Sequence, residues 1–444
     1  MSFEETIFAL ASGRGRAGVA VVRLSGPGAM ASLAALTGRE LPEPRRATLR
    51  NLYGKSENSL IDQSLVLAFP GPDSFTGEDV VELHLHGGPA ILNALFAELS
   101  VMEGLRMAEP GEFARRAFEH GKMDLTAAEG LGDLVNAETE AQARQALRQM
   151  EGELGRLYDG WRGELTTALA HLEADIDFPD EDLPDGVAAA IAPKMAALAA
   201  EIAAHLADGH RGEKIRDGLD VVILGAPNVG KSSLLNALAR RDAAIVSDQA
   251  GTTRDIVEVP MDIAGFSVTL ADTAGLRVSG DAIEQEGVRR ARARAEKADL
   301  RVLMTTTDDP ALPEEFAGLY RDGDFHLVNK ADLLAEGSMP VAGPITPLLI
   351  SVKTGAGIEA FLSRLEQDVT ARLDLSGAPA LTRLRHRTAL EECYAALLRF
   401  ETAPDPELAA EDIRLAVRAL GRITGRVDVE DILDIVFGDF CIGK

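Results

Sequence analysis

The stretch from Leu219 to Ser233 restricts the possible folds of this chain more than any other. An apolar run, Leu219–Leu224, is followed by a loop of the form G-x-x-x-x-G-K-S that begins at Gly225, and then by a helical pattern. The two glycines of such a loop let backbone N–H groups and the start of the helix face a polyphosphate. Lys231 would reach the outer phosphates, and the Ser232 hydroxyl would ligate Mg²⁺. The sequence therefore predicts a nucleoside-triphosphate site between a buried strand and a helix.

Length and composition indicate a globular chain of about three domains, since it has 444 residues of which 46% are hydrophobic. Its two cysteines, Cys393 and Cys441, lie far apart in the sequence, which excludes a disulfide framework and favours a reducing, cytoplasmic location. No secretory leader and no apolar run of membrane-spanning length are expected. The 71 acidic residues against 45 Lys and Arg give a net charge of −26, which disfavours broad nucleic-acid binding.

Four segments are predicted from the patterning. Residues 1–120 combine strand-like runs at 18–24 and 79–86 with helical stretches after Pro27, Gly88 and Pro110, which indicates a small α+β domain. Apolar residues at helical spacing between 147 and 176, and again beyond 380, predict a helical domain in two parts, 121–213 and 376–444. Residues 214–375 alternate strands and helices, which predicts an α/β domain with a mostly parallel sheet inserted into the helical one.

Three further motifs identify the nucleotide as GTP. Asp272-Thr-Ala-Gly275 ends a predicted strand, where its carboxylate approaches Mg²⁺ and its glycine meets the γ-phosphate. The segment 251–255 (GTTRD) is placed like the mobile loop whose threonine completes the metal shell. Asn329-Lys330-Ala-Asp332 supplies a carboxylate for the guanine edge, and 351–353 (SVK) follows it. Many GTPases carry a glutamine directly after the Asp-x-x-Gly motif, but this chain has Leu276, so another group must orient the attacking water.

In this order, together with a terminal Cys-Ile-Gly-Lys at 441–444, the motifs resemble the MnmE (TrmE) family of tRNA-modification GTPases, which belongs to the TrmE-Era-EngA-YihA-Septin-like group. The stretches VVRLSGPG, SFTGEDVVELHLHGGP, PGEFARRAF and KMDLTAAEG resemble the folate-binding domain of that family, and ADIDFPDED its helical domain. The resemblance implies a homodimer joined through the N-terminal domains and a flavoprotein partner, MnmG (GidA). It also implies addition of an aminomethyl or carboxymethylaminomethyl group to carbon 5 of the wobble uridine of certain tRNAs.

The resemblance also implies ligands residue by residue. A one-carbon carrier, 5,10-methylenetetrahydrofolate (or 5-formyltetrahydrofolate), would contact Arg23, Glu82, Lys122 and Lys444. Mg²⁺ would be held by Ser232 and Thr253, and K⁺ by Asn228, Ser247, Gln249 and Thr252. Lys231 and Glu284 would be catalytic, the latter replacing the missing glutamine, and Cys441 is a candidate reactive thiol. The expected GTP-binding residues are Asn228, Val229, Gly230, Lys231, Ser232, Ser233, Ser247, Asp248, Gln249, Ala250, Gly251, Thr252, Thr253, Asp272, Thr273, Ala274, Gly275, Asn329, Lys330, Asp332, Ser351, Val352 and Lys353.

Several alternatives remain at this stage. Arg23 could be a surface charge on an edge strand with Glu82 as its partner, and Glu284 could simply favour the start of a helix. His84 and His86 share one strand face, but no further ligand pattern accompanies them, so a metal site is disfavoured. A ribosome-assembly GTPase would carry a basic RNA module with a G-x-x-G loop, and 421–425 (GRITG) is one residue too long. A membrane-remodelling GTPase would need a basic amphipathic stretch, which the sequence lacks.

Overall fold

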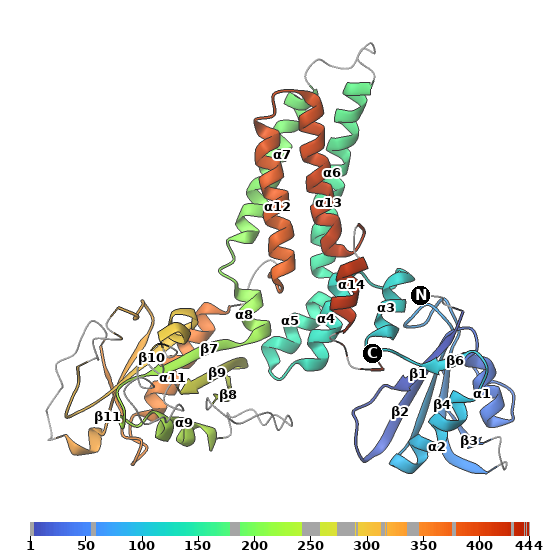
Figure 1. Cartoon of the computed structure of the whole chain (residues 1–444), viewed down its shortest axis with the longest axis horizontal. Coiled ribbons are helices and arrows are strands. Elements are labelled where there is room, and N and C mark those ends of the chain that lie inside the picture. Colours follow the sequence, from blue (N-terminus) through green and yellow to red (C-terminus); the bar gives the residue numbers. More distant parts are fainter. Residues whose placement is uncertain are drawn as a thin grey trace. The chain divides into compact units, whose positions relative to one another are not determined.

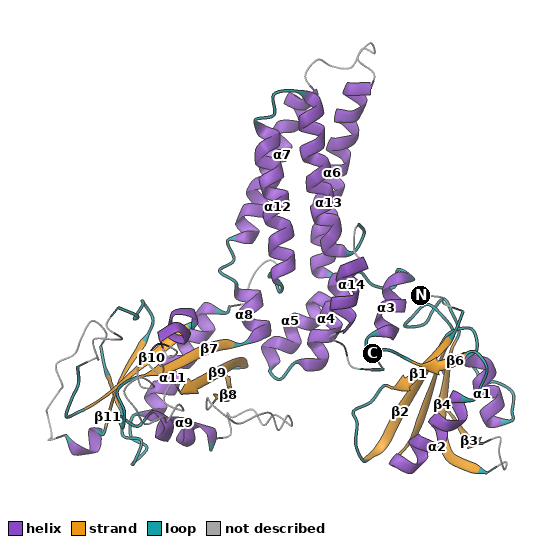
Figure 2. Ribbon diagram, viewed as in Figure 1, coloured by secondary structure: helices purple, strands orange, loops and turns teal. Residues whose placement is uncertain are grey.

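The computed structural model describes residues 4–54, 59–177, 187–241, 258–272, 289, 292–311, 316, 318–334, 346–374, 379–427, 430–438, 440 and 442–443. The chain divides into two compact units (Figure 1). The first contains Met1–Gly132, Gln149–Met195 and Ala395–Lys444, and the second contains Asp133–Arg148 and Ala196–Tyr394. Each unit has its own six-stranded sheet together with helices (Figure 2).

The sheet of the first unit is mixed and has the order β3-β4-β5-β2-β1-β6. Its elements are β1 (Thr6–Leu10), β2 (Ala17–Ser25), α1 (Ala29–Thr37), β3 (Thr48–Tyr53), β4 (Leu60–Phe69), β5 (Val80–Gly87), α2 (Pro89–Ser100), β6 (Leu105–Met107) and α3 (Glu112–Glu119). Inward residues of the strands, such as Val22, Leu24 and Leu83, form one core with residues of α1 and α2. Because side chains alternate along a strand, Arg23 and Glu82 lie on the opposite face of the sheet.

The predicted strands at 18–24 and 79–86 and the three predicted helices are present as β2, β5, α1, α2 and α3. Strand β4 was not predicted, because its buried face carries Asp62 and Ser64 while Leu65 on the other face is 45% exposed. Asp62 accepts the backbone N–H of His86 at 2.8 Å, and Ser64 donates to the carbonyl oxygen of His84 at 2.8 Å. Both buried polar side chains therefore have hydrogen-bond partners. Because polar residues occupy the buried face here, the sequence lacks the alternation of apolar and polar residues that predicts a strand.

The helical part comprises α4 (Leu125–Asn136), α5 (Glu140–Met150), α6 (Glu153–Asp177), α7 (Val187–Leu206), α8 (Arg211–Asp217), α12 (Leu384–Glu401), α13 (Pro406–Thr424) and α14 (Glu430–Gly438). The predicted continuous seam is interrupted between α5 and α6, where Gly152 has a φ of 79°. In the first unit α6 packs against α13. Helix α13 begins at the cap Asp405, whose side chain accepts the N–H of Leu408, and it ends at Gly425 with a φ of 84°.

One described helical stretch, Ala190–Asp217, is long and apolar enough to cross a membrane by length and composition, with a mean hydropathy of 1.2. A single such helix is weak evidence, because a core helix of a soluble protein passes the same test. The expectation that the chain has no membrane span therefore stays a prediction.

The sheet of the second unit has the order β12-β11-β10-β7-β9-β8, and only β8 runs antiparallel to its neighbour. Its elements are β7 (Leu219–Leu224), α9 (Lys231–Ala239), β8 (Glu258–Ile263), β9 (Phe266–Asp272), β10 (Leu300–Thr306), β11 (Phe325–Asn329), the short 3₁₀ helix η2 (Ala331–Leu333), β12 (Leu348–Leu349) and α11 (Ile358–Arg372). Residues of α9 and α11 pack on one face, and Ala295, Phe316 and Leu319 pack on the other. The predicted hairpin is present, with positive φ at both Ala264 and Gly265.

The fold class is therefore as predicted: an α/β nucleotide-binding domain inserted into a helical domain and preceded by an α+β domain. The finer boundaries at 120, 213 and 375 stay predictions.

Candidate functional site

The loop between β7 and α9 has the backbone of a phosphate cradle. Gly225 has a φ of 156° and Gly230 a φ of 108°, values that a side chain would strain. A Cβ atom on Gly225 would lie 2.1 Å from the carbonyl oxygen of Met304, and one on Gly230 would lie 2.4 Å from Nδ2 of Asn329. Both glycines are thus required by close packing against neighbouring strands, and α9 begins directly after the second one. Its free N–H groups face the cradle.

Lys231 is buried at the base of this loop, with 5% of its surface exposed. Its Nζ donates to the carbonyl oxygens of Gly225 at 2.7 Å and Ala226 at 2.9 Å. Burial lowers the pKa of Lys231, and the nearby carboxylate of Asp272 partly opposes this shift. The ammonium of Lys231 donates both of these hydrogen bonds to backbone carbonyl oxygens of the loop. A phosphate bound in the loop could therefore accept from this ammonium.

The predicted Mg²⁺ group is partly assembled. The Ser232 hydroxyl donates to Oδ2 of Asp272 at 2.5 Å, so the first turn of α9 and the end of β9 meet at one point. Hydroxyl and carboxylate oxygens are the ligands that Mg²⁺ prefers. The third predicted contributor, Thr253, lies outside the described residues.

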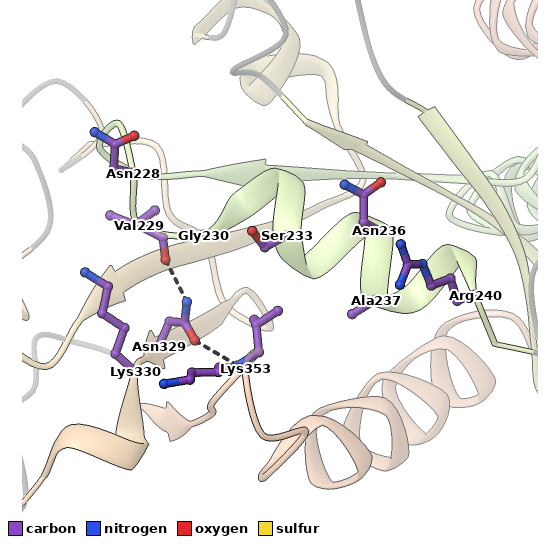
Figure 3. Close-up of a pocket in the computed structure, with 11 residues that line it drawn as sticks. Asn228, Val229, Gly230, Ser233, Asn236, Ala237, Arg240, Asn329, Lys330 and Lys353 are labelled. Atoms are coloured by element: carbon purple, nitrogen blue, oxygen red, sulfur yellow. Dashed lines mark hydrogen bonds between the residues drawn. The ribbon is translucent and has the colours of Figure 1, made fainter.

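Asn329 joins the phosphate loop to the predicted guanine loop. Its Nδ2 donates to the carbonyl oxygen of Val229 at 2.8 Å, and its Oδ1 accepts the N–H of Val352 at 3.1 Å. Figure 3 shows the side chain lying between these two segments. With 5% of its surface exposed, Asn329 is a structural bridge inside the pocket.

The carboxylate of Asp332, which is predicted to contact guanine, is also positioned by a neighbour. The Ser351 hydroxyl donates to Oδ1 of Asp332 at 2.7 Å, and this hydrogen bond is the main cause of the lowered pKa of Asp332. The carboxylate is therefore ionised near neutral pH and can accept from the donor pair of a guanine edge. Lys330, at the turn before it, has a φ of 63°.

These segments enclose a pocket of about 500 Å³. Its lining comprises Asn228, Val229, Gly230, Ser233, Asn236, Ala237, Arg240, Asn329, Lys330, Val352 and Lys353. Eight of these lining residues were predicted, whereas Asn236, Ala237 and Arg240 were not. The spacing of residues along α9 could have indicated them. Helical periodicity places Ser233, Asn236, Ala237 and Arg240 on the face opposite the buried leucines.

Several predicted site residues lie outside the described part of the chain. These are Ser247, Asp248, Gln249, Ala250, Gly251, Thr252, Thr253, Thr273, Ala274, Gly275, Glu284, Cys441 and Lys444. Their roles stay predictions.

The predicted folate residues of the N-terminal sheet are brought together in part. Arg23 and Glu82 are cross-strand partners on β2 and β5, and Nη2 of Arg23 lies 2.9 Å from Oε1 of Glu82. The guanidinium also faces the rings of Phe75 and Phe113, at 5.3 and 5.7 Å from their centroids. Of the alternative reading of Arg23, the edge-strand part is wrong, because β2 lies between β5 and β1, whereas the pairing with Glu82 is present. Lys122 lies beside Gly77, two residues after Phe75 in the sequence.

The C-terminal segment returns to this domain. Ile442 forms an isolated β-bridge with Pro110, and Gly443, with a φ of 102°, sits against the end of β1. A Cβ atom on Gly443 would lie 2.1 Å from the carbonyl oxygen of Leu10. The described end of the chain, Ile442 and Gly443, is therefore held against the domain that carries Arg23.

The histidines of β5 are engaged in pairs. Nδ1 of His86 lies 2.8 Å from Oδ1 of Asp62, and Nε2 of His84 lies 3.4 Å from Oε2 of Glu82. Among the described residues, no group of three or more His, Cys, Asp or Glu side chains is arranged to hold a metal ion. The expectation that His84 and His86 hold no metal ion stays a prediction.

At the carboxyl ends of parallel strands the chain has a phosphate cradle, a buried lysine, a Ser–Asp pair and an Asn-Lys-x-Asp loop. These features define a GTP-binding P-loop protein. The comparisons with known proteins extend this class. The model of the MnmE helical domain matches residues 125–441, and that of the GTP-binding protein TrmE N-terminus matches residues 6–122. The chain belongs to the MnmE family of tRNA modification GTPases and is a GTP-hydrolysing enzyme.

Relatives match over at least 93% of their length. The tRNA modification GTPase MnmE of Parvibaculum lavamentivorans is 57% identical, with 99% of this chain and 100% of that protein covered. The protein of the same name from Rhodospirillum rubrum is 55% identical, with 99% of each chain covered. A mitochondrial subunit of the rat 5-taurinomethyluridine-[tRNA] synthase is 48% identical, with 99% of this chain and 93% of that protein covered. The solved G domain of the T. maritima FeoB iron transporter covers 35% of this chain at 23% identity and a TM-score of 0.23.

Proposed function

We propose that this GTPase, with a flavoprotein partner of the MnmG (GidA) kind, adds an aminomethyl or carboxymethylaminomethyl group to carbon 5 of the wobble uridine of certain tRNAs. The observation that carries the proposal is the full-length match to tRNA modification GTPases, one relative being named for a 5-substituted uridine in tRNA. The competing role in ribosome assembly loses its candidate feature, because Gly421 and Thr424 lie in the last turn of α13 and Gly425 caps it. A cytoplasmic location is part of the proposal.

GTP hydrolysis would use the site described above. Lys231 would leave its carbonyl partners for the β- and γ-phosphates, and Ser232 would hold Mg²⁺ together with Thr253. The 2.5 Å contact between Ser232 and Asp272 supports this, since it gathers hard oxygen ligands beside the phosphate cradle. Mg²⁺, when bound, neutralises charge that develops on the phosphates. Glu284 would orient the attacking water in place of the missing glutamine.

The K⁺ site would comprise Asn228 and the backbone oxygens of Ser247, Gln249 and Thr252. Asn228 has a φ of 65° and lines the pocket at the phosphate end, which supports its side-chain oxygen as a ligand. We expect turnover of the full-length protein to be faster in K⁺ or Rb⁺ than in Na⁺ at fixed ionic strength, and Asn228→Ala to lose that difference. Equal rates in Na⁺ and K⁺ would remove the ion from the mechanism. Glu284→Ala should slow single-turnover hydrolysis without weakening GTP binding.

The one-carbon donor would be a reduced folate bound on the Arg23 face of the N-terminal sheet. The 2.9 Å Arg23–Glu82 pair, flanked by Phe75 and Phe113, supports this, because it offers a carboxylate for pterin amines beside aromatic faces. Lys122 and Lys444 would complete the site.

Calorimetry with 5-formyltetrahydrofolate tests that site. The double variant Arg23→Ala, Glu82→Ala should lose measurable binding. A matched control removes the exposed ion pair Arg46–Glu43 of the same domain, whose side chains are 74% and 68% exposed, and should bind like wild type. Equal affinity of both double variants would refute the folate assignment.

Homodimerisation through the N-terminal domain is supported by the part of the sheet that α1 and α2 do not cover. Leu49 and Leu65 are cross-strand partners there and are 54% and 45% exposed, and Val19 is 58% exposed. We expect light scattering to report a dimer for wild type and a monomer for Leu65→Glu. A wild-type monomer at micromolar concentration would contradict the proposed assembly.

A further inference from the structure

One wall of the nucleotide pocket is the exposed face of α9. Ser233, Asn236, Ala237 and Arg240 follow one another at helical spacing and all line the pocket, as Figure 3 shows. The other face of this helix is fixed in the core by Leu234, Leu235 and Leu238, which are fully buried. The helix therefore cannot rotate, and Arg240 is held at the outer end of this wall.

Arg240 differs from its neighbour in charge pairing. Arg241 forms an ion pair with Glu359 on α11, away from the pocket lining. No carboxylate of the described residues forms an ion pair with Arg240, which is exposed at the pocket. Lys330 and Lys353 line the same pocket from other segments. The described lining thus carries three cationic side chains and no acidic one.

The distance along α9 decides which part of the nucleotide Arg240 meets. It follows Lys231 by nine positions, which corresponds to about 13 Å of helix rise from the phosphate end. Side chains of a helix tilt toward its N-terminus, so the guanidinium is directed back over the pocket. Gly230 of the phosphate cradle and Arg240 line the same pocket, so a nucleotide whose phosphates lie at Gly230 and whose nucleoside extends along α9 would bring that nucleoside to Arg240.

We propose that Arg240 is a nucleotide-retention residue, whose planar guanidinium contacts the nucleoside of bound GTP or GDP and closes the outer end of the pocket. A guanidinium suits this role, because it stacks on aromatic faces and donates in a fixed plane to hydroxyl or carbonyl oxygens. The inference rests on the assignment of this pocket to a guanine nucleotide. It concerns affinity and residence time, since Arg240 is remote from the phosphate that reacts.

The dissociation rate of GDP tests this role. It is measured as release of tritium-labelled GDP from the full-length protein in the presence of Mg²⁺ and excess unlabelled GDP, because a tritium label leaves the ribose unmodified. Arg240→Ala should release GDP about tenfold faster than wild type, with a matching rise in KM for GTP and less than a twofold change in kcat. Arg241→Ala, which removes the same charge one position later, should stay within twofold of wild type. Arg240→Lys keeps the charge without the plane and should release GDP nearly as fast as Arg240→Ala.

Three outcomes would overturn the proposal. Equal release from Arg240→Ala and Arg241→Ala would show that Arg240 makes no particular contact. Wild-type retention in Arg240→Lys would reduce its role to net charge. A fall in kcat with unchanged GDP release would place Arg240 in the chemistry instead. Failure of wild type to bind GDP at all would refute the pocket assignment itself, which separates the two claims.

Discussion

Replacing Asn329 by alanine should weaken GDP binding by about 30- to 150-fold, because this side chain joins the two halves of the pocket. The substitution removes the bonds of 2.8 Å to the Val229 carbonyl and 3.1 Å from the Val352 N–H, and it leaves both backbone groups without that partner. Each buried polar group left unsatisfied costs about 1–3 kcal/mol. Since the pocket is open to water, we take the low end, about 2–3 kcal/mol in total, which converts to the stated factor.

Isothermal titration of the nucleotide-free protein with GDP measures this loss. Hydrogen exchange of the peptides that contain Val229 and Val352 should become faster in the same variant, since Val352 loses the acceptor of its N–H. Asn236→Ala is the matched control, because Asn236 lines the same pocket without a hydrogen bond to the described residues. It should bind GDP within about threefold of wild type. If Asn329→Ala also stays within threefold, the bridge does not organise the pocket.

Three further predictions follow from buried or strained groups. Burial lowers the pKa of Lys231, and a bound phosphate would raise it, so in the pH range between the lowered pKa and the ordinary lysine value of about 10.4 GDP binding should take up a proton and weaken as the pH rises. Calorimetry in buffers of different ionisation enthalpy would detect that uptake, and its absence would show that Lys231 does not meet the phosphates. Burial raises the pKa of Cys393 to about 12, so iodoacetamide at pH 8 should leave Cys393 unlabelled in the native protein and label it after unfolding, as read by mass spectrometry. Gly443→Ala should displace the C-terminal segment and lower folate affinity at least tenfold, whereas Gly438→Ala, where a Cβ meets nothing within 4 Å, should bind folate normally.

The features that were predictable from the sequence are those with a local cause. The phosphate loop needs glycines at two positions, and both have the positive φ that their spacing predicts. The hairpin at Ala264 and Gly265 likewise follows from two adjacent residues that tolerate such backbone angles. The Asn-Lys-x-Asp motif ends a strand as expected.

The features that were not predictable depend on tertiary contacts. Strand β4 places Asp62 and Ser64 in the buried face because partners on β5 satisfy them, and no single-sequence pattern contains those partners. The bridging role of Asn329 depends on Val229, which is 100 residues distant in the sequence. Arg240 lines the pocket because it lies on the face of α9 that is turned away from the core. In the sequence, only the spacing of the leucines of α9 indicates which face that is.

The central claim is that GTP hydrolysis by this chain supports modification of a wobble uridine in tRNA. Mass spectrometry of wobble nucleosides tests it most directly, in a strain that lacks the gene and is complemented with either wild type or Lys231→Ala at matched protein levels. We expect the deletion strain and the Lys231→Ala strain to lack the carbon-5 aminomethyl or carboxymethylaminomethyl group, and wild type to restore it. Modified wobble uridine in the deletion strain, or full restoration by Lys231→Ala, would contradict the account.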